Sequence, residues 1–423
     1  MPYLLGYNQE IITPESPMLM SGYSPLRHNI GCHDPLFVKT HCFYNETTKE
    51  LFILVTLDLL AVDNTLKVFV ETELLKELGS KVSTLHLFLC ATHTHSGPIG
   101  TLDTRTSLKN PLSTIFGEFN QSYIDFLKIK IVESIKKAFF KVSPFLYRVK
   151  RTSIDTIGRN RNDQNQDCDF DIFLIEFSKK FEKTLLVNYS CHPTVLDGEN
   201  QLFSSDFLNS LYKTLEDEYE GVQFLNGSCG NISTRFTKSE ASFEQADIFG
   251  RLLAAQVKNA LSCKWKELKS ISVFDDFYTA TAKKKEENQV MSHKFTETKQ
   301  NHFNEGNSNL LSRLENNILE TIKAKSIVEA SLKNITSLKI PFSIIKFDDY
   351  LFLTLPGEIT SELTKELRQN HKLKVIGLCN DYLFYFAPKD YFEMNTYEAN
   401  SSFLEKGEAE KLIQYITCKV ENL

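Results

Sequence analysis

Short apolar runs alternate with segments of helical periodicity along most of the chain. The predicted strands span residues 51–60, 84–91, 171–177, 184–190, 222–227, 338–346, 350–355 and 374–379. The predicted helices span residues 65–78, 123–140, 206–219, 243–261, 309–332, 358–369 and 403–417. Strands that alternate with helices in this way are typical of an α/β protein. We therefore predict a mixed β-sheet core flanked by helices.

One segment departs from this alternation. Residues 281–308 are rich in Lys, Glu, Asn and His and contain few apolar residues, which predicts an exposed insertion or mobile loop. No internal repeat stands out elsewhere, and no sharp change of composition marks a domain boundary. The sequence therefore predicts one compact unit that spans residues 1–423.

Composition limits the partners and the location of the protein. With 42% hydrophobic residues, the chain of 423 residues can bury a large core. Its formal net charge of -6 argues against nucleic acid as the main partner.

The apolar run at 51–62 is too short for a bilayer and contains Asp58, so we expect no transmembrane segment. Residues 1–17 lack the features of a signal peptide, and the nine cysteines are scattered without Cys-x-x-Cys pairs. These features predict a cytoplasmic protein, whereas nothing in the pattern indicates an oligomeric state.

The first candidate for chemistry is the stretch LFLCATHTHSGPIG at 87–100. His93 and His95 lie two residues apart at the end of a predicted strand, so their side chains can share one face. Neutral imidazole is a favoured ligand of Zn²⁺. Two histidines that bond backbone carbonyls in a loop would be about as common, so this motif alone does not decide between the two interpretations.

Three further stretches place chemically useful side chains after predicted strands. NYSCHPTVL contains His192, LTLPGEIT contains Glu358 at the predicted start of a helix, and NDYLFYFAPKDYFEMNTYEA contains four tyrosines. Open α/β sheets gather their ligand-binding groups at strand ends. Each stretch taken singly is more typical of a structural role, such as a carboxylate at a helix start or packed aromatic rings.

Taken together, these motifs resemble one known family. ATHTHSGPIG, NYSCHPT, NGSCGNISTR, LPGEIT and NDYLFYFAPKDYFEMNTYEA occur in the order found in the neutral/alkaline (non-lysosomal) ceramidase family. The opening GYNQEIITPESPMLMSGYSPLRHNIGCHDPLFVKT also resembles the start of that family's catalytic domain. The resemblance extends from about Gly6 to the C-terminal helix. It implies a zinc-dependent amidase that hydrolyses the N-acyl bond of ceramide, or of a related N-acyl lipid or small amide, by metal-activated water.

The resemblance also implies a role for particular residues. The zinc ligands of the family correspond to His93, His192, Glu358 and Tyr385, with Tyr382 as the alternative to Tyr385. Its other active-site groups correspond to His95, Arg161, Ser233 and Tyr397. Arg161 and Tyr397 would donate to the developing oxyanion, and His95 would carry a proton to the leaving amine. Ser233 is viewed in the family either as a nucleophile or as a group that binds near the metal, and both roles stay open.

The chain also departs from the family pattern. Where the family typically has Gly-Asp-Val-Ser-Pro, this chain has GNIST, with Asn231 in place of the acid and Thr234 in place of the proline. It ends soon after the tyrosine-rich stretch, so we expect no C-terminal β-sandwich domain. Two alternatives therefore remain: a hydrolase of another soluble amide or ester on the same zinc site, or a non-catalytic binding protein. The complete set of ligands argues against the second.

Overall fold

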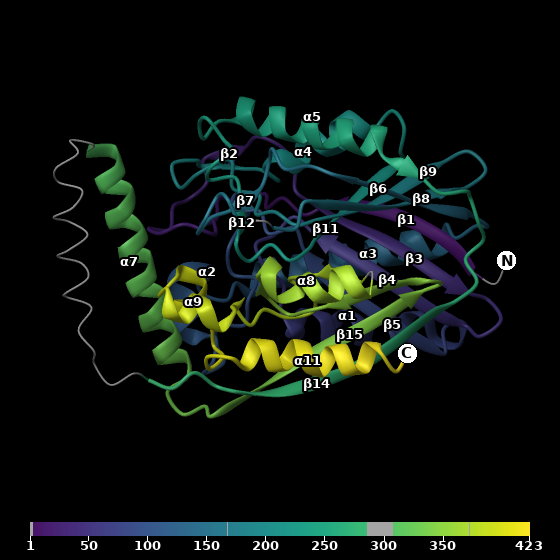
Figure 1. Cartoon of the computed structure of the whole chain (residues 1–423). Coiled ribbons are helices and arrows are strands. Elements are labelled where there is room, and N and C mark those ends of the chain that lie inside the picture. Colours follow the sequence, from purple (N-terminus) through teal and green to yellow (C-terminus); the bar gives the residue numbers. More distant parts are fainter. Residues whose placement is uncertain (1–2, 167, 286–307, 372) are drawn as a thin grey trace.

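Three units with the same strand order build the protein (Figure 1). The computed structural model describes residues 3–166, 168–285, 308–371 and 373–423. In each unit the first strand pairs antiparallel with the second, the second antiparallel with the third, and the third parallel with the fourth. One helix connects the third strand to the fourth, and another follows later in the unit. The predicted mixed-sheet α/β fold is confirmed.

The elements of the three units have the following bounds. The first contains β1 (Tyr3–Ile11), β3 (Phe37–Asn45), β4 (Glu50–Leu57), α1 (Asn64–Leu78), β5 (Thr84–Ala91) and α3 (Gln121–Phe140). The second contains β6 (Leu146–Ser153), β8 (Asp171–Ser178), β9 (Lys183–Tyr189), α4 (Phe207–Leu215), β11 (Gly221–Asn226) and α5 (Phe243–Asn259), with β13 (Leu261–Ser262) beside β6. The third contains β14 (Ile271–Thr281), α7 (Ser308–Ser331), β15 (Ser337–Phe347), β16 (Tyr350–Thr354), α8 (Ser361–Asn370), β18 (Lys374–Ile376) and α11 (Glu408–Val420).

Short elements connect and complete these units. Three two-stranded sheets pair β2 (Gly31–Cys32) with β10 (Leu202–Phe203), β7 (Arg159–Asn160) with β12 (Ile232–Ser233), and β17 (Glu358–Ile359) with β19 (Tyr385–Phe386). The short helices are η1 (Gly79–Lys81), η2 (Asn110–Leu112), α2 (Ser113–Phe116), α9 (Lys389–Glu393) and α10 (Tyr397–Asn400). One of these sheets joins two units, because β2 of the first unit pairs with β10 of the second. The other two each pair strands of a single unit, the second for β7 and β12 and the third for β17 and β19.

The three large sheets share an aromatic core. The ring of Phe43 from the first sheet lies 5.4 Å from Phe177 of the second and 5.6 Å from Phe347 of the third. All three rings are almost fully buried. Burial of such rings is a major source of folding free energy, so this cluster holds the sheets against one another. Helices cover the outer faces, with α4 and α5 over the second sheet in Figure 1.

Local sequence explains where the long helices begin. Asp63 accepts a hydrogen bond from Thr65 N at the start of α1, and Asn120 accepts one from Tyr123 N at the start of α3. Ser242 caps α5 in the same way. Such side chains satisfy amide groups that the first helical turn leaves unpaired.

The three-unit topology was not predicted, because no repeat is visible in the sequence. The third and fourth strands of each unit run parallel, so their carboxyl ends lie at the same edge of their sheet. The predicted site motifs follow these strands in all three units: His93 follows β5, His192 follows β9 and Glu358 follows β16. The repeat therefore supplies the candidate site from three separate parts of the chain.

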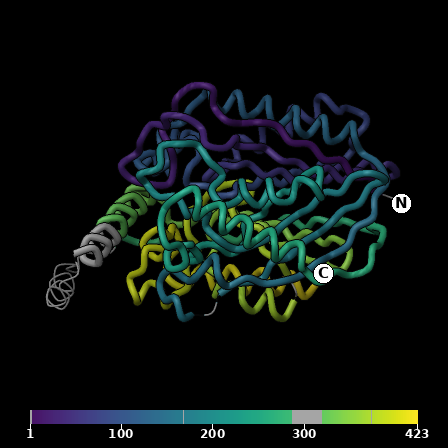
Figure 2. Tube along the Cα trace, turned by 90° about the horizontal axis from the view of Figure 1, so that it is seen from above, coloured from purple at the N-terminus to yellow at the C-terminus, as the bar shows by residue number. Residues whose placement is uncertain are grey.

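The remaining predictions concern α7 and its neighbours. In both views, α7 lies at the side of the molecule opposite to the start of β1 (Figures 1 and 2). Its bounds agree closely with the helix predicted at 309–332. The insertion predicted at 281–308 lies mostly outside the described residues, which resume at 308, and residue 281 itself ends β14. Within the described ranges, none of the helices combines the length and the apolar character needed to cross a bilayer.

A buried charge cluster next to the site gives a stability prediction. The Lys109 ammonium group bonds Asp63 at 2.6 Å and also Asp381. Burial acts to raise the pKa of Asp63, but Lys109, together with hydrogen bonds from Asp103 and Thr65, outweighs burial and lowers the pKa. We expect Lys109→Met to reduce the free energy of unfolding by about 3–5 kcal/mol at pH 7, because it leaves buried carboxylates unpaired.

The pH dependence of this effect follows from the lowered pKa. The stabilisation is present above the unfolded-state pKa of Asp63, about 3.9, and is lost as the pH falls through the lower folded-state value. The difference between the parent and Lys109→Met in urea unfolding should therefore persist from pH 7 down to about pH 4 and shrink only below pH 4. Lys76→Met on the exposed side of α1 serves as the control, with an expected change of about 0.5 kcal/mol or less. An equal effect of both variants would contradict the prediction.

Candidate functional site

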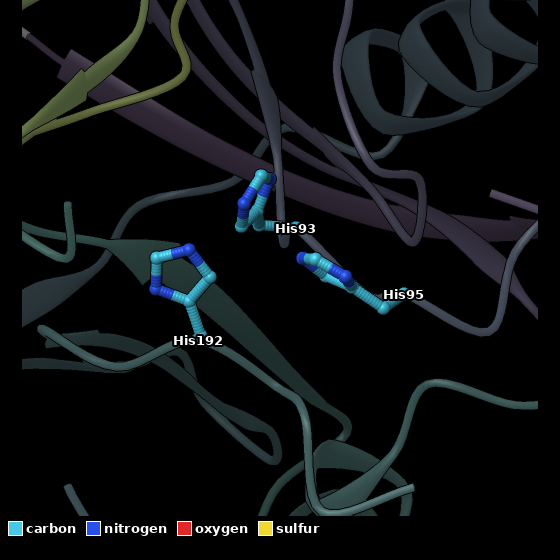
Figure 3. A group of neighbouring side chains, drawn as sticks. All are labelled: His93, His95 and His192. Carbon is cyan, nitrogen blue, oxygen red and sulfur yellow. The ribbon is translucent and has the colours of Figure 1, made fainter. Parts of the chain in front are cut away.

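Three histidines from two units lie together in the structure. His93 and His95 follow β5, and His192 follows β9. One potential ligand atom from each lies within 4.8 Å of the others, and Figure 3 shows the three rings gathered in one place. The ring centroids of His93 and His192 are 4.7 Å apart. The structure therefore brings both histidines of the His-x-His motif into the same cluster as His192.

Backbone carbonyl groups orient all three rings. The partners of Nδ1 are Leu60 O at 2.7 Å for His93, Ile232 O at 3.0 Å for His192, and Gly22 O at 3.2 Å for His95. A carbonyl oxygen accepts only, so each Nδ1 carries a hydrogen, and in the neutral rings of His93 and His95 the Nε2 atom keeps its lone pair. The Nε2 atoms of His93 and His95 are buried and have no hydrogen-bond partner among the described residues. Orphaned buried nitrogen atoms of this kind fit a metal ligand.

The backbone around these histidines is strained or closely packed. His93 has φ 73°, a left-handed conformation that non-glycine residues rarely adopt. Gly22 has φ 92°, and a Cβ atom at this position would lie 2.4 Å from Nδ1 of His95. Gly22 is therefore needed both for its conformation and for its close approach to the ring. Such strained positions cluster at functional sites.

Glu358 supplies a carboxylate to the same cluster. Its Oε2 lies 2.8 Å from Nε2 of His192 and 3.3 Å from Nε2 of His93, and its side chain is almost fully buried. Tyr382 donates a hydrogen bond of 2.6 Å to Oε1. Burial acts to raise the pKa of Glu358, but the two histidines outweigh it and hold the pKa well below its ordinary value.

The prediction that Glu358 begins a helix was wrong. Glu358 lies in β17, in parallel register with Tyr385 of β19, and α8 begins three residues later at Ser361. The physical reason is a long-range strand pairing. Its main-chain hydrogen bonds, which include Glu358 N to Phe384 O, hold this residue in extended backbone.

Arg161 and two tyrosines lie next to this carboxylate. The Arg161 guanidinium lies 5.4 Å from the ring centroid of Tyr385 and 5.3 Å from that of Tyr397. Its Nε donates to Glu398 at 2.6 Å, whereas its buried Nη2 has no hydrogen-bond partner among the described residues. Arg161 is thus held by a buried carboxylate with one donor still available.

These contacts shift the pKa values of the group. Burial raises the pKa of Tyr397 to about 12, although Arg161 opposes this effect. Burial also raises the pKa of Tyr385 well above its ordinary value, again with Arg161 in opposition. Burial, followed by the neighbouring His93 and His192, lowers the pKa of His95 well below its ordinary value. A neutral His95 can accept a proton.

Ser233 lies beside the histidine cluster in the short strand β12. The carbonyl of the preceding Ile232 accepts hydrogen bonds from both the main chain and the ring of His192. Ser233 Oγ accepts a hydrogen bond of 3.3 Å from Arg235 N. The approach of this loop to β17 requires Gly230, since a Cβ atom there would lie 2.8 Å from the carbonyl oxygen of Glu358.

Sequence reasoning missed several residues that build this site. Glu398, which is fully buried and holds Arg161, directly follows Tyr397, and this adjacency was its only local signal. The main-chain carbonyl groups of Leu60, Ile232 and Gly22 could not be predicted as partners of the histidines, because every residue has such a group whatever its side chain. They are recognised only from the folded backbone.

One cavity described in the structure is separate from this cluster. It has a volume of about 230 Å³, and its lining includes His86 of β5, Asp275 of β14, Ser343 of β15 and Asn380, which follows β18. None of the predicted site residues lines it. The candidate site therefore rests on the convergence of buried side chains and not on the size of a cavity.

The donor set fits a zinc ion. Imidazole nitrogen and carboxylate oxygen atoms are its usual ligands in catalytic sites. Two sets are within reach: the three histidines, or His93 and His192 together with Glu358. The phenol groups of Tyr382 and Tyr385 both lie beside the carboxylate of Glu358.

Comparisons with known proteins agree with this picture. A family profile described as "Neutral/alkaline non-lysosomal ceramidase, N-terminal" matches residues 3–318. The crystal structure of neutral ceramidase from Pseudomonas aeruginosa is similar, with a TM-score of 0.75 and 17% identity, over 100% of this chain and 75% of that one. A structure titled "Ceramidase complexed with C2" has the same TM-score and identity, over 98% and 74% of the two chains. Among curated proteins, none matches the sequence.

Proposed function

The chain belongs to the neutral/alkaline non-lysosomal ceramidase family, and from this premise we propose that it is a zinc-dependent amide hydrolase. Its substrate would be ceramide or a related amide with an apolar acyl group. Family membership supports a ceramidase-like hydrolase. The observation that supports a metal site is the convergence of three groups in one buried cluster: Nε2 of His93, Nε2 of His192 and the carboxylate of Glu358.

We assign His93, His192, Glu358 and Tyr385 as the residues that would hold zinc. Tyr382 is the weaker candidate for the fourth position, because its hydroxyl already donates to Oε1 of Glu358 at 2.6 Å. Ligating carboxylates are commonly hydrogen-bonded in this way by an outer partner. When bound, zinc would supply Lewis-acid polarisation of the amide carbonyl and a water of lowered pKa.

The chain's own residues would stabilise charge that develops on the substrate. Arg161 is fixed by Glu398 through Nε, which leaves the buried Nη2 free to donate to an oxyanion. Tyr397 lies beside the same guanidinium and keeps its proton at neutral pH, because its pKa is raised to about 12. Donors held in place before the reaction, in a site with little water, are an effective form of transition-state stabilisation.

His95 would transfer the proton in this reaction. Its ring is fixed through Nδ1 by the Gly22 carbonyl, and its Nε2 is free. The neutral ring would accept a proton from the attacking water and pass it to the leaving amine. Ser233, beside the Ile232 carbonyl that orients His192, would contact the substrate, as nucleophile or as a binding group.

Hydrolysis of N-acyl amides by the purified protein tests this function. We expect cleavage of a fluorogenic N-acyl sphingosine or a related long-chain amide, loss of activity with a chelator, and recovery on addition of Zn²⁺. Metal analysis of the same preparation should give one Zn²⁺ per chain. If the protein cleaves only short soluble amides or esters, its substrate is one of these and not a lipid amide. A protein that binds zinc but hydrolyses none of the panel would contradict the enzymatic role.

A further inference from the structure

The position where the chain departs from the family motif lies in a buried polar network behind the candidate site. Asn231 is fully buried, and its Nδ2 lies 2.8 Å from both carboxylate oxygens of Glu362 and 2.9 Å from the hydroxyl of Tyr391. Its Oδ1 accepts a hydrogen bond of 3.0 Å from Ser361 N. Both ends of this amide are therefore committed to partners on α8 and α9.

Glu362 is the centre of this network. Besides Asn231, its Oε1 accepts from Asn160 Nδ2 at 2.9 Å and from the Tyr391 hydroxyl at 2.9 Å. These donors come from β7, the loop before β12, and α9, whereas Glu362 lies in the first turn of α8. One carboxylate thus joins four separate elements.

The elements joined by this carboxylate also carry the candidate site. The Asn231 main-chain carbonyl accepts from Arg161 N at 2.8 Å, and the next residue, Ile232, orients His192 through its own carbonyl. On the other side, α8 begins three residues after Glu358. The network therefore lies between the parts of the chain that hold Arg161, His192 and Glu358.

We propose that Glu362 and Asn231 are a pair of positioning residues that fix His192 and Arg161 relative to Glu358. The proposal rests on the function proposed above. The pair requires one carboxylate and one neutral amide, because an acid at position 231 would face the carboxylate of Glu362. The acid that the family motif has at this position is therefore incompatible with this chain unless residue 362 changes as well.

The charged surroundings of Glu362 support this requirement. Burial raises its pKa, and hydrogen bonds from Tyr391 and Asn231 oppose that effect. The charge of Glu398 raises its pKa further. Two carboxylates about 3 Å apart cannot both be ionised.

A charge-exchange cycle tests the pair. Asn231→Asp should lower the affinity of the purified protein for Zn²⁺, measured by competition with a chelator, by about 10–100-fold at pH 8. The loss should diminish towards pH 5, where the two carboxylates can share a proton. The double variant Asn231→Asp/Glu362→Gln restores one acid and one amide, so its affinity should return to within a few-fold of the parent at both pH values. Glu366→Gln, on an exposed position of α8, should match the parent.

Each outcome of this cycle decides the proposal. Parent-like zinc affinity of Asn231→Asp at pH 8 overturns it, and so does a double variant that is no better than the single one. If Asn231→Asp fails to fold, recovery of the fold in the double variant supports the pair, and failure of both variants overturns it. A parent that binds zinc but cleaves no amide contradicts the proposed function alone, because the cycle needs no substrate. A parent that binds no zinc contradicts both proposals.

Discussion

His192→Ala is expected to abolish tight zinc binding and, with it, hydrolysis. The imidazole of His192 lies 2.8 Å from Glu358 through Nε2 and is fixed through Nδ1 by Ile232 O. The substitution removes a direct ligand, so affinity should fall by more than the roughly 10–100-fold that loss of an outer partner costs. Metal analysis after dialysis should find far less than one Zn²⁺ per chain.

The control for this prediction is another histidine. His86→Ala changes a partly exposed histidine on β5, the strand that leads to His93, outside the three-histidine cluster. It should keep zinc and activity. Circular dichroism of His192→Ala should remain close to that of the parent, because the aromatic core between the sheets is unchanged. Full zinc occupancy in His192→Ala would show that this side chain is not a ligand.

Tyr397→Phe is expected to reduce kcat by about 100-fold or more while zinc stays bound. Loss of one preorganised oxyanion donor typically has an effect of this size. The phenol lies next to Arg161 and is not among the proposed zinc ligands, so its removal should leave the metal in place. Steady-state kinetics on the best amide substrate, together with metal analysis of the same sample, separate the two effects. Ser233→Ala should be impaired in a similar way.

A second tyrosine provides the matched control. Tyr415→Phe removes a partly buried hydroxyl that bonds Asp276 at 2.9 Å, on α11 and away from the cluster. It should leave kcat unchanged. If Tyr397→Phe and Ser233→Ala both turn over at the rate of the parent, these residues have been assigned to the wrong roles, even where zinc is confirmed.

Local patterns predicted the buried strands and amphipathic helices well. The run predicted at 84–91 is β5 to the residue, and the helix predicted at 123–140 is α3 with two further residues at its start. β5 is a continuous apolar run that is mostly buried, and α3 is buried along one side at helical spacing, and these are the patterns that a hydrophobicity analysis detects. β14 was not predicted. It is a half-exposed strand in which Asp275 and Asp276 interrupt the alternation of apolar and polar residues. Its pairing with β15 holds it in place.

The sequence by itself determined which residue types are available for catalysis and the order in which they occur. His93, His192, Glu358 and the tyrosine-rich stretch each follow a predicted strand, and their order carried the resemblance to a family that the profile match supports. That much is local information, since a strand end and a reactive side chain lie within a few residues of each other.

Only the tertiary structure decided how these residues meet. His192 and Glu358 are 166 positions apart, yet their side chains lie within 2.8 Å, because three units of the same topology bring their strand ends together. The carbonyl partners of the histidines, the Glu398 support of Arg161 and the Glu362 network arise from the same convergence. Contacts of this kind depend on how distant segments pack, and neither periodicity nor motif spacing within one segment contains that information.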